Sequence, residues 1–206
     1  MNKIFIEAKD KRTSEYHFLK TILNLFFPDK EVDFIYMDGI GNLFNETNVN
    51  QMLQSQIDGN QVLVLADADT KAKGYGYKKR KEEIDSGMLI HGVSFSCFIY
   101  PDNQSDGDIE TLMEFAARRD LHPVFFDCFE DYEKCVSGVK DSNGQAIYNV
   151  PNLKGKLHTY MSAQKLSGRL RNRLGSGDWL FDNRNYWNLD VVALRPLKDF
   201  LTENLK

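Results

Sequence analysis

Two aspartates that follow a short apolar run have the clearest potential for chemistry in this chain. Val62 to Leu65 are consecutive apolar residues, and Asp67 and Asp69 follow them one residue apart. Such a run is typical of a strand buried on both faces of a parallel sheet. Ligands of open α/β sheets bind at the carboxyl ends of the strands, and carboxylate oxygens suit Mg²⁺ or Mn²⁺. The alternative is that these aspartates only form a turn, where the residue type is common.

Two other expected strand ends also carry acids. Glu7 follows the first apolar segment, and Asp106, Asp108 and Glu110 follow a fourth segment that ends at Tyr100. In a doubly wound sheet these ends can converge in one crevice. Converging carboxylates are what a one- or two-metal phosphoryl-transfer site needs, and a further carboxylate can move protons.

The elements that must position these acids alternate along the first part of the chain. Apolar patterns predict four strands and the helices between them. The expected strands cover residues 3–6, 32–37, 62–66 and 93–100. The first helix is expected to have Ser14 as its N-cap and to stop before Pro28. Strands separated by helices imply crossover connections, so we predict an α/β fold with a mostly parallel central sheet flanked by helices.

The second part of the chain is expected to be helical. We predict a core over residues 1–122 and a mainly helical C-terminal extension, residues 123–206, packed on that core. Helices are expected at 124–139, at 154–174 and near 191–205, with Pro196 either interrupting the last helix or lying in its first turn. The Ser-Asn-Gly sequence at 142–144 is a candidate for a short hairpin.

Composition narrows the classes of partner. The chain has 206 residues, a net charge of −4 and 42% hydrophobic residues, as expected for a globular protein with a core. A negative net charge argues against coating nucleic acid by bulk charge, but it leaves room for a local basic patch.

Two stretches are candidates for such a patch. The run Lys78, Lys79, Arg80 and Lys81 would contact a phosphate backbone beside the acidic site, or it would be a solvated helix face. The cations of the expected 154–174 helix have the same two interpretations, and either Lys156, the candidate catalytic lysine, or Lys154 could reach a phosphate group.

Location is indicated by what the sequence lacks. The three cysteines form no Cys-x-x-Cys pair, which disfavours zinc sites and disulfides. The apolar segment near the N-terminus is too short for a signal peptide. No apolar run approaches the ~20 residues that span a membrane. We therefore expect a cytoplasmic protein that makes no membrane contact.

The order of the acids resembles that of the Toprim family, which includes topoisomerases, primases, ribosomal-RNA maturases and overcoming-lysogenization-defect nucleases. In that family a glutamate follows the first strand and an Asp-x-Asp follows the third, and here Glu7 and Asp67-Ala-Asp69 look like those elements. Ala8 stands where the family has a glycine. The segment Tyr100–Glu110 is similar to the Gly-Asp-Leu-Glu element of the nuclease-like members, and is closer still to a small group of uncharacterised bacterial Toprim-like proteins. Those have a helical C-terminal region with a lysine-containing helix and a Trp-Phe-Asp-like tail, here Trp179–Asp182.

The resemblance implies a Toprim-like fold and a Mg²⁺- or Mn²⁺-dependent nuclease acting on DNA or RNA. Metal would be held by Asp67, Asp69 and Glu110, with Asp106 and Asp108 as weaker candidates. Glu7 would be a general acid/base or a bridging ligand. A chain this short would select its substrate with a partner protein or further copies of itself.

A second hypothesis remains open. The same scaffold could be a non-catalytic module that binds a nucleotide or a partner protein, with vestigial acids. The negative net charge and the alanine at residue 8 favour this alternative.

Overall fold

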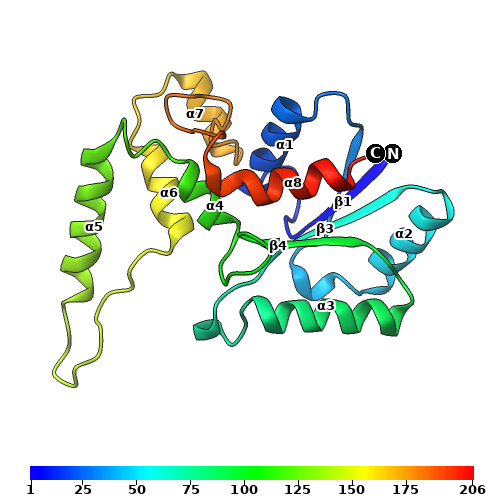
Figure 1. The fold of residues 1–206 in the computed structure, drawn as a ribbon. Helices are drawn as coiled ribbons and strands as arrows, with labels where there is room; N and C mark the ends of the chain where they lie inside the picture. Colours follow the sequence, from blue (N-terminus) through cyan, green and yellow to red (C-terminus); the bar gives the residue numbers. More distant parts are fainter.

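The computed structural model describes all of residues 1–206 and contains one four-stranded sheet. Its strands, all parallel, are β1 (Asn2–Ile6), β2 (Val32–Tyr36), β3 (Gln61–Asp67) and β4 (Ser96–Tyr100), in the order β2-β1-β3-β4. Helices cover both faces (Figure 1). The α/β class and the parallel sheet expected from the sequence are therefore confirmed.

Alternate residues of each strand serve two separate cores, because successive side chains point to opposite faces. The larger core contains Ile4, Ile6, Leu63 and Leu65. The smaller core contains Val64 and the other strand residues whose side chains point to the same face of the sheet as Val64. β3 is almost completely buried, as its unbroken apolar run predicts. This burial fixes where β3 ends, and so where Asp67 emerges.

Each face has its own set of helices. The larger core is covered by α1 (Ser14–Phe26), α4 (Ile109–Ala116) and α8 (Arg195–Asn204), and the smaller by α2 (Glu46–Ile57) and α3 (Tyr77–His91). The two sets lie on opposite sides of the sheet in Figure 1. The short 3₁₀ turns η1 (Ile40–Asn42), η2 (Lys71–Lys73) and η3 (Val192–Leu194) lie in the connections.

Helix starts differ slightly from the expectation. Thr13, not Ser14, is the N-cap of α1, because its hydroxyl accepts a hydrogen bond from the Tyr16 amide at 3.3 Å. Asn45 caps α2 in the same way, because its side-chain oxygen accepts a hydrogen bond from the Asn48 amide at 2.8 Å. Helix α3 fills most of the connection between β3 and β4.

The sheet order contains a switch point. The chain passes from β1 to β2 on one side and then returns to place β3 on the other side of β1. In open α/β sheets the crevice at such a point, outside the carboxyl ends of the strands, is the usual ligand site. β1 and β3 end there with Glu7 and Asp67.

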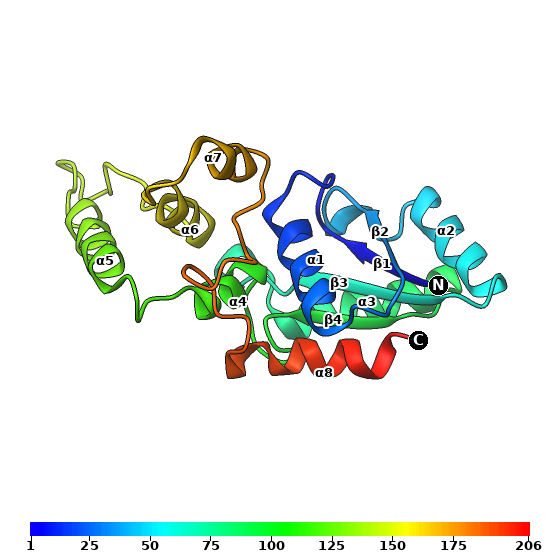
Figure 2. The same ribbon diagram turned by 90° about the horizontal axis from the view of Figure 1, so that it is seen from above.

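The C-terminal part lies beyond those strand ends. Helices α5 (Pro123–Ser137), α6 (Leu153–Ser162) and α7 (Gly168–Gly175) lie on that side of the sheet, with α5 standing farthest out (Figure 2). A turn with a bridge between Lys140 and Ala146 follows α5, where a hairpin was expected.

The single helix expected over 154–174 is wrong, since α6 and α7 are separate. The Gln164 side chain donates to the Tyr160 carbonyl at 2.9 Å and so satisfies an acceptor at the end of α6. Ser167 and Gly168, residue types with weak helix propensity, begin α7. The break lets α6 bury Tyr160 while α7 turns to bury Leu174.

Helix α8 returns to the sheet. Pro196 lies in its first turn, where the missing amide hydrogen costs nothing, and α8 packs against β4. The chain ends meet: Asn2 Nδ2 donates to the Lys206 carbonyl, and the Lys206 amide donates to Asn2 Oδ1, both at 3.0 Å. None of these helices has both the length and the apolar character that crossing a membrane requires.

Candidate functional site: a carboxylate cluster at the strand ends

Glu7 and Asp67 meet at the switch point, as the sequence predicts. Glu7 Oε1 accepts a hydrogen bond from the Asp67 amide at 2.7 Å, so the acid after β1 holds the backbone at the end of β3. Asp67 Oδ1 in turn accepts from the Ile109 amide at 2.9 Å, which fixes the first residue of α4. Each carboxylate thus joins its strand to the next element in space.

Glu15, which the sequence analysis did not single out, extends this arrangement. Its Oε1 accepts from the Glu7 amide at 3.1 Å. Glu15 lies in the first turn of α1, where an acid usually just complements the helix dipole. The sequence does contain a pattern that predicts its burial, because Glu15 lies on the same helix face as Phe18 and Ile22, three and seven residues further on. An acid on an apolar stripe is buried, and Glu15 is only 9% exposed.

Glu110 completes what we call the carboxylate cluster, defined as Glu7, Glu15, Asp67 and Glu110. It lies in the first turn of α4, is 8% exposed, and its Oε1 is 2.9 Å from the Lys154 ammonium of α6. In every member of the cluster one oxygen is held by an amide or by Lys154. The second oxygens of Glu15, Asp67 and Glu110 accept no hydrogen bond within the chain. The Glu7 carboxylate, by contrast, also lies close enough to the Ile40 amide for that donor to lower its pKa.

The cluster holds protons more tightly than isolated carboxylates do. Burial raises the pKa of Glu15 to about 8, and repulsion from Glu7 adds to the effect. Burial, followed by the charges of Glu7 and Glu110, raises the pKa of Asp67 well above its usual range. Burial also raises the pKa of Glu7. Burial lowers the Lys154 pKa, but attraction to Glu110, together with that to Glu15 and Asp67, outweighs it and the net shift is upward. Lys154 at Glu110 and Arg80 near Glu7 are therefore the cations that face this group of four acids.

Two hydroxyl groups beside the cluster have no partner. Tyr100 Oη and Ser14 Oγ are buried without a hydrogen bond. Burial raises the pKa of Tyr100 far above its usual range, and the charges of Glu15 and Asp67 raise it further, which shows how near the phenol lies. Unpaired buried hydroxyls are costly, so they indicate where a water or a polar ligand would gain hydrogen bonds.

Asp69 lies next to the cluster with both oxygens engaged. Lys73 approaches its Oδ1 at 2.8 Å and Arg80 its Oδ2 at 3.3 Å. Its φ of 57° is in the left-handed region, and its carbonyl accepts from the Gly107 amide at 2.9 Å. The second acid of the Asp-x-Asp is therefore clamped by cations rather than free.

The basic run at 78–81 splits into different roles. Arg80 is buried: it donates to the Asp67 carbonyl at 3.1 Å, and its guanidinium lies 4.4 Å from the centre of the Tyr75 ring. Lys79 donates to a backbone carbonyl and Lys81 pairs with Asp85. Only Lys78 has no partner in the chain, so the run supports the β3 end more than it offers free charge.

Asp106 and Asp108 act as helix caps. Asp106 Oδ1 accepts from the Tyr77 amide at 2.9 Å and so caps α3 across the loop. Asp108 is the N-cap of α4, in a capping box with Thr111. These two acids, which the sequence made candidates for metal binding, have structural partners.

Lys156 points away from the cluster. Its ammonium lies 2.8 Å from Glu114 and 3.7 Å from Glu130, and its side chain is buried. Lys154, two residues earlier, is the lysine that contacts the cluster. Because i and i+2 face different sides of a helix, only one of the two can do so.

The carboxylate oxygens of the cluster are suitable ligand atoms for a divalent cation, but their positions do not form a coordination site. Carboxylate oxygens are the ligands that Mg²⁺ prefers, and the second oxygens of Glu15, Asp67 and Glu110 are available. No group of three or more His, Cys, Asp or Glu side chains is, however, arranged to hold an ion. A cation would need these side chains to rotate toward one another.

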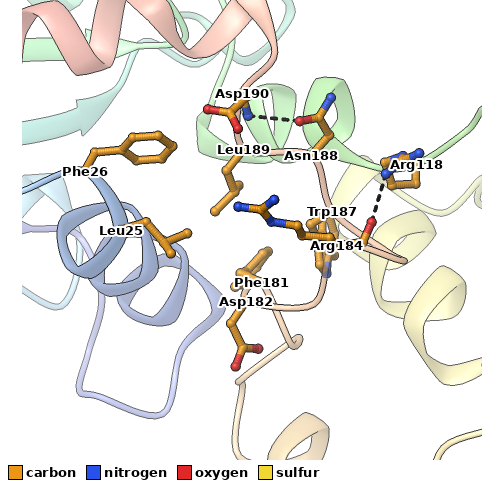
Figure 3. Close-up of a pocket in the computed structure, with 10 residues that line it drawn as sticks. All are labelled: Leu25, Phe26, Arg118, Phe181, Asp182, Arg184, Trp187, Asn188, Leu189 and Asp190. Atoms are coloured by element: carbon orange, nitrogen blue, oxygen red, sulfur yellow. Dashed lines mark hydrogen bonds between the residues drawn. The ribbon is translucent and has the colours of Figure 1, made fainter.

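A separate cavity of about 330 Å³ lies between the end of α1 and residues 181–190 (Figure 3). It contains no member of the carboxylate cluster. Most of its charged side chains already form ion pairs. Arg118 pairs with Asp120, Asp182 with Arg173, and Asp190 with Lys198. The cluster, not this cavity, is therefore the candidate site.

No curated protein and no solved structure matches this chain. A family model described as a protein of unknown function, DUF3226, matches residues 1–206, which is the whole length of the chain. The protein with this carboxylate cluster therefore belongs to the DUF3226 family.

Proposed function

We propose that the protein is a Mg²⁺- or Mn²⁺-dependent phosphoryl-transfer enzyme of Toprim type, a nuclease acting on DNA or RNA. The observation that carries the proposal is the convergence of Glu7, Glu15, Asp67 and Glu110 at the β1–β3 switch point. Each carboxylate is held by a backbone amide or by Lys154, and Glu15, Asp67 and Glu110 keep a second oxygen free. Buried like charges with raised pKa values are typical of functional sites, because such groups destabilise a fold.

The free oxygens of Asp67, Glu15 and Glu110 would hold the cation. A bound Mg²⁺ or Mn²⁺ would supply charge stabilisation at the phosphoryl oxygens. The hydrogen bonds to backbone amides then have a clear purpose, because they orient each carboxylate without using both of its oxygens. The unpartnered Tyr100 hydroxyl would donate to a water or a phosphate oxygen in the same space.

Glu7 would move the proton, or bridge to the cation as a ligand. Its raised pKa brings it nearer to neutral pH, where a general base is most effective. Lys154, rather than Lys156, would contact the phosphate, since its flexible ammonium already lies at Glu110. Asp69 would join the metal ligands only after Lys73 and Arg80 release it, and so would contribute less than Asp67.

The Toprim assignment is supported by topology. The glutamate after β1 and the first aspartate after β3 come from neighbouring strands and touch through a 2.7 Å hydrogen bond. A cytoplasmic location, nucleic-acid substrates and a partner protein or second copy for substrate selection belong to the same proposal. All three cysteines are free thiols, as a reducing compartment allows.

One observation favours the alternative of a non-catalytic nucleotide- or protein-binding module. Both oxygens of Asp69 already have cationic partners, and the cluster is not closed around an ion. In such a module Lys154, Lys73 and Arg80 would permanently replace the cation. The two candidates differ in whether the protein binds Mn²⁺ and cleaves phosphodiesters.

The test compares wild type with Asp67→Asn and with Asp102→Asn, which changes a half-buried acid of the β4–α4 loop that lies outside the cluster and accepts hydrogen bonds only from Gln104 and Ser105. Asparagine at 67 can still accept from the Ile109 amide, so the fold is retained while one buried charge disappears. Without metal at pH 8, Asp67→Asn should melt higher by a few degrees, because like charges no longer repel. It should lose most of the Mn²⁺-dependent stabilisation and the cleavage of labelled single- and double-stranded DNA and RNA.

Asp102→Asn should keep both properties. If the wild-type protein gains no stability from Mn²⁺ and cleaves none of the four substrates, the proposal of a metal-dependent nuclease is refuted. The non-catalytic binding module is then the remaining candidate. A lower melting temperature for metal-free Asp67→Asn would instead make Asp67 a structural turn residue.

A further inference from the structure

Arg184 is the one charged side chain lining the cavity beside α1 that has no partner of opposite sign. Its carbonyl accepts a hydrogen bond from Arg118 Nη1 at 2.9 Å, but its own guanidinium makes no hydrogen bond or ion pair within the chain. In Figure 3 the Arg184 side chain extends toward Leu189, into the space beside α1. The Asp182 carboxylate points the other way. The Arg184 guanidinium, which has five N–H donors, is therefore free to bind an acceptor in this cavity.

The other charges of the cavity are neutralised by the ion pairs described above. Lys198, which pairs with Asp190 at 3.4 Å, also has its ammonium 3.4 Å from the centre of the Phe26 ring, so it is held at the edge of the cavity. Arg184 thus leaves one uncompensated positive charge, in a chain whose net charge is −4. This local charge favours a ligand with a single negative charge.

The rest of the cavity offers apolar surface. Leu25 and Phe26 line it from the end of α1, and Trp187 and Leu189 line it from the facing segment. Leu25 is 52% exposed, so a ligand in the cavity would cover apolar surface that water now contacts. The volume of about 330 Å³ is at the lower end of the range for small-molecule sites, which combine apolar walls with a few polar groups that fix orientation.

The segment that carries Arg184 is fixed by hydrogen bonds to its surroundings. The Trp187 indole donates to the Trp179 carbonyl at 2.7 Å, and the Asn188 amide donates to the Ala116 carbonyl at 2.7 Å. Asn188 Oδ1 accepts from the amide of Asp190 at 3.0 Å. Because these bonds hold the wall in place without a ligand, binding does not have to supply the free energy of ordering it.

We propose that this cavity binds a small aromatic carboxylate, with its carboxylate held by Arg184 and its ring packed against Leu25 and Phe26. A carboxylate fits because a guanidinium binds it through two parallel hydrogen bonds, and because it brings the single negative charge that the cavity lacks. An aromatic body fits because ring pairs are attractive beyond the area they bury. The site goes beyond the proposed function and is separate from the carboxylate cluster, none of whose members lines the cavity.

The experiment measures binding of 2-naphthoate and phenylacetate by isothermal titration calorimetry. The matched neutral probes are 2-naphthamide and phenylacetamide, which keep each ring system but replace the carboxylate with an uncharged amide. The variants are Arg184→Ala and, for the apolar wall, Leu25→Ala, and both change exposed residues. Arg195→Ala is the matched control, since Arg195 is also exposed and unpaired but does not line the cavity. Thermal melting checks that every variant is folded.

We expect the wild-type protein to bind at least one of the two carboxylates ~10-fold more tightly than its amide, because hydrogen bonds between charged groups are stronger than those to neutral ones. Arg184→Ala should lose on the order of 10- to 100-fold in affinity for the carboxylate and little for the amide. Leu25→Ala should weaken binding of carboxylate and amide to a similar degree, whereas Arg195→Ala should match wild type.

Three results would overturn the inference: a wild type that binds neither carboxylate more tightly than its amide, an Arg184→Ala variant with wild-type affinity, and an equal loss of affinity in Arg195→Ala. A further variant separates this site from the proposed nuclease. Asp67→Asn should bind the carboxylates as tightly as wild type does, with and without Mn²⁺. If Asp67→Asn loses carboxylate binding, the carboxylates bind at the cluster rather than in the cavity, and the inference is refuted.

Discussion

Two groups of acids lie at the same edge of the sheet, and they have different surroundings. Glu7, Glu15 and Asp67 are largely buried, accept hydrogen bonds from amides of neighbouring elements and have raised pKa values. Asp106 and Asp108 lie in the loop before α4 and accept amide hydrogen bonds at the starts of α3 and α4. Both groups hold backbone, but only the first concentrates negative charge away from water.

The difference shows that what a carboxylate does depends on its surroundings more than on its position. A cap at a helix start gains stability from the dipole and from an orphan amide. A carboxylate among other buried carboxylates loses stability unless a cation or protons compensate. Function is therefore expected where the fold tolerates this loss, and the predictions below are chosen to test that distinction.

The largest expected difference is in catalysis. Glu7→Gln keeps an oxygen that can accept from the Asp67 amide but removes the charge and the basicity. We expect cleavage to slow on the order of 10² to 10⁴-fold while Mn²⁺ affinity, measured by calorimetry, changes little. Asp108→Asn keeps an N-cap acceptor and should cleave at close to the wild-type rate. If Glu7→Gln loses metal affinity as strongly as Asp67→Asn does, then Glu7 is a ligand first.

The next difference is in the pH dependence of stability without metal. The Glu15 pKa is about 8 in the fold against an ordinary value of 4.5, so between these values the folded protein binds the extra proton. Stability should therefore fall as pH rises through this window, by up to ~1.4 kcal/mol per pH unit for one such proton. Glu7 and Asp67 shift in the same direction and add to the slope.

Urea unfolding from pH 5 to 8 in EDTA measures this slope. Glu15→Gln should flatten it, because the variant has no proton to release there, while Asp108→Asn should keep the wild-type slope. An unchanged slope in Glu15→Gln would mean that Glu15 is ionised in the fold and that the cluster is better solvated than its burial indicates.

The smallest expected effect is that of a cap. Asp108→Ala removes the acceptor of the Thr111 amide and should cost about 1 kcal/mol of unfolding free energy. Asp108→Asn should recover most of this loss, and neither change should alter stabilisation by Mn²⁺ in thermal melts. If Asp108→Asn is no longer stabilised by Mn²⁺, then Asp108 is a metal ligand rather than only a helix cap.

Local patterns predicted much of the fold, and the reasons are physical. The short apolar run before Asp67 favours a strand buried on both faces, and Pro28 disfavours continuation of the first helix. The break between α6 and α7 could not be predicted, because no proline marks it. It depends on the surfaces that Tyr160 and Leu174 bury, and these are formed by distant segments.

The sequence by itself determined that acids follow the strands, since chain order and periodicity fix where strands end. Only the tertiary structure decided which acids meet. Glu15 joins Glu7 because α1 packs its apolar stripe on the sheet, whereas Asp106 turns to α3 and Lys154, not Lys156, faces Glu110. Charge clusters depend on distances across the fold, and such distances are set by packing between elements rather than by spacing along the chain.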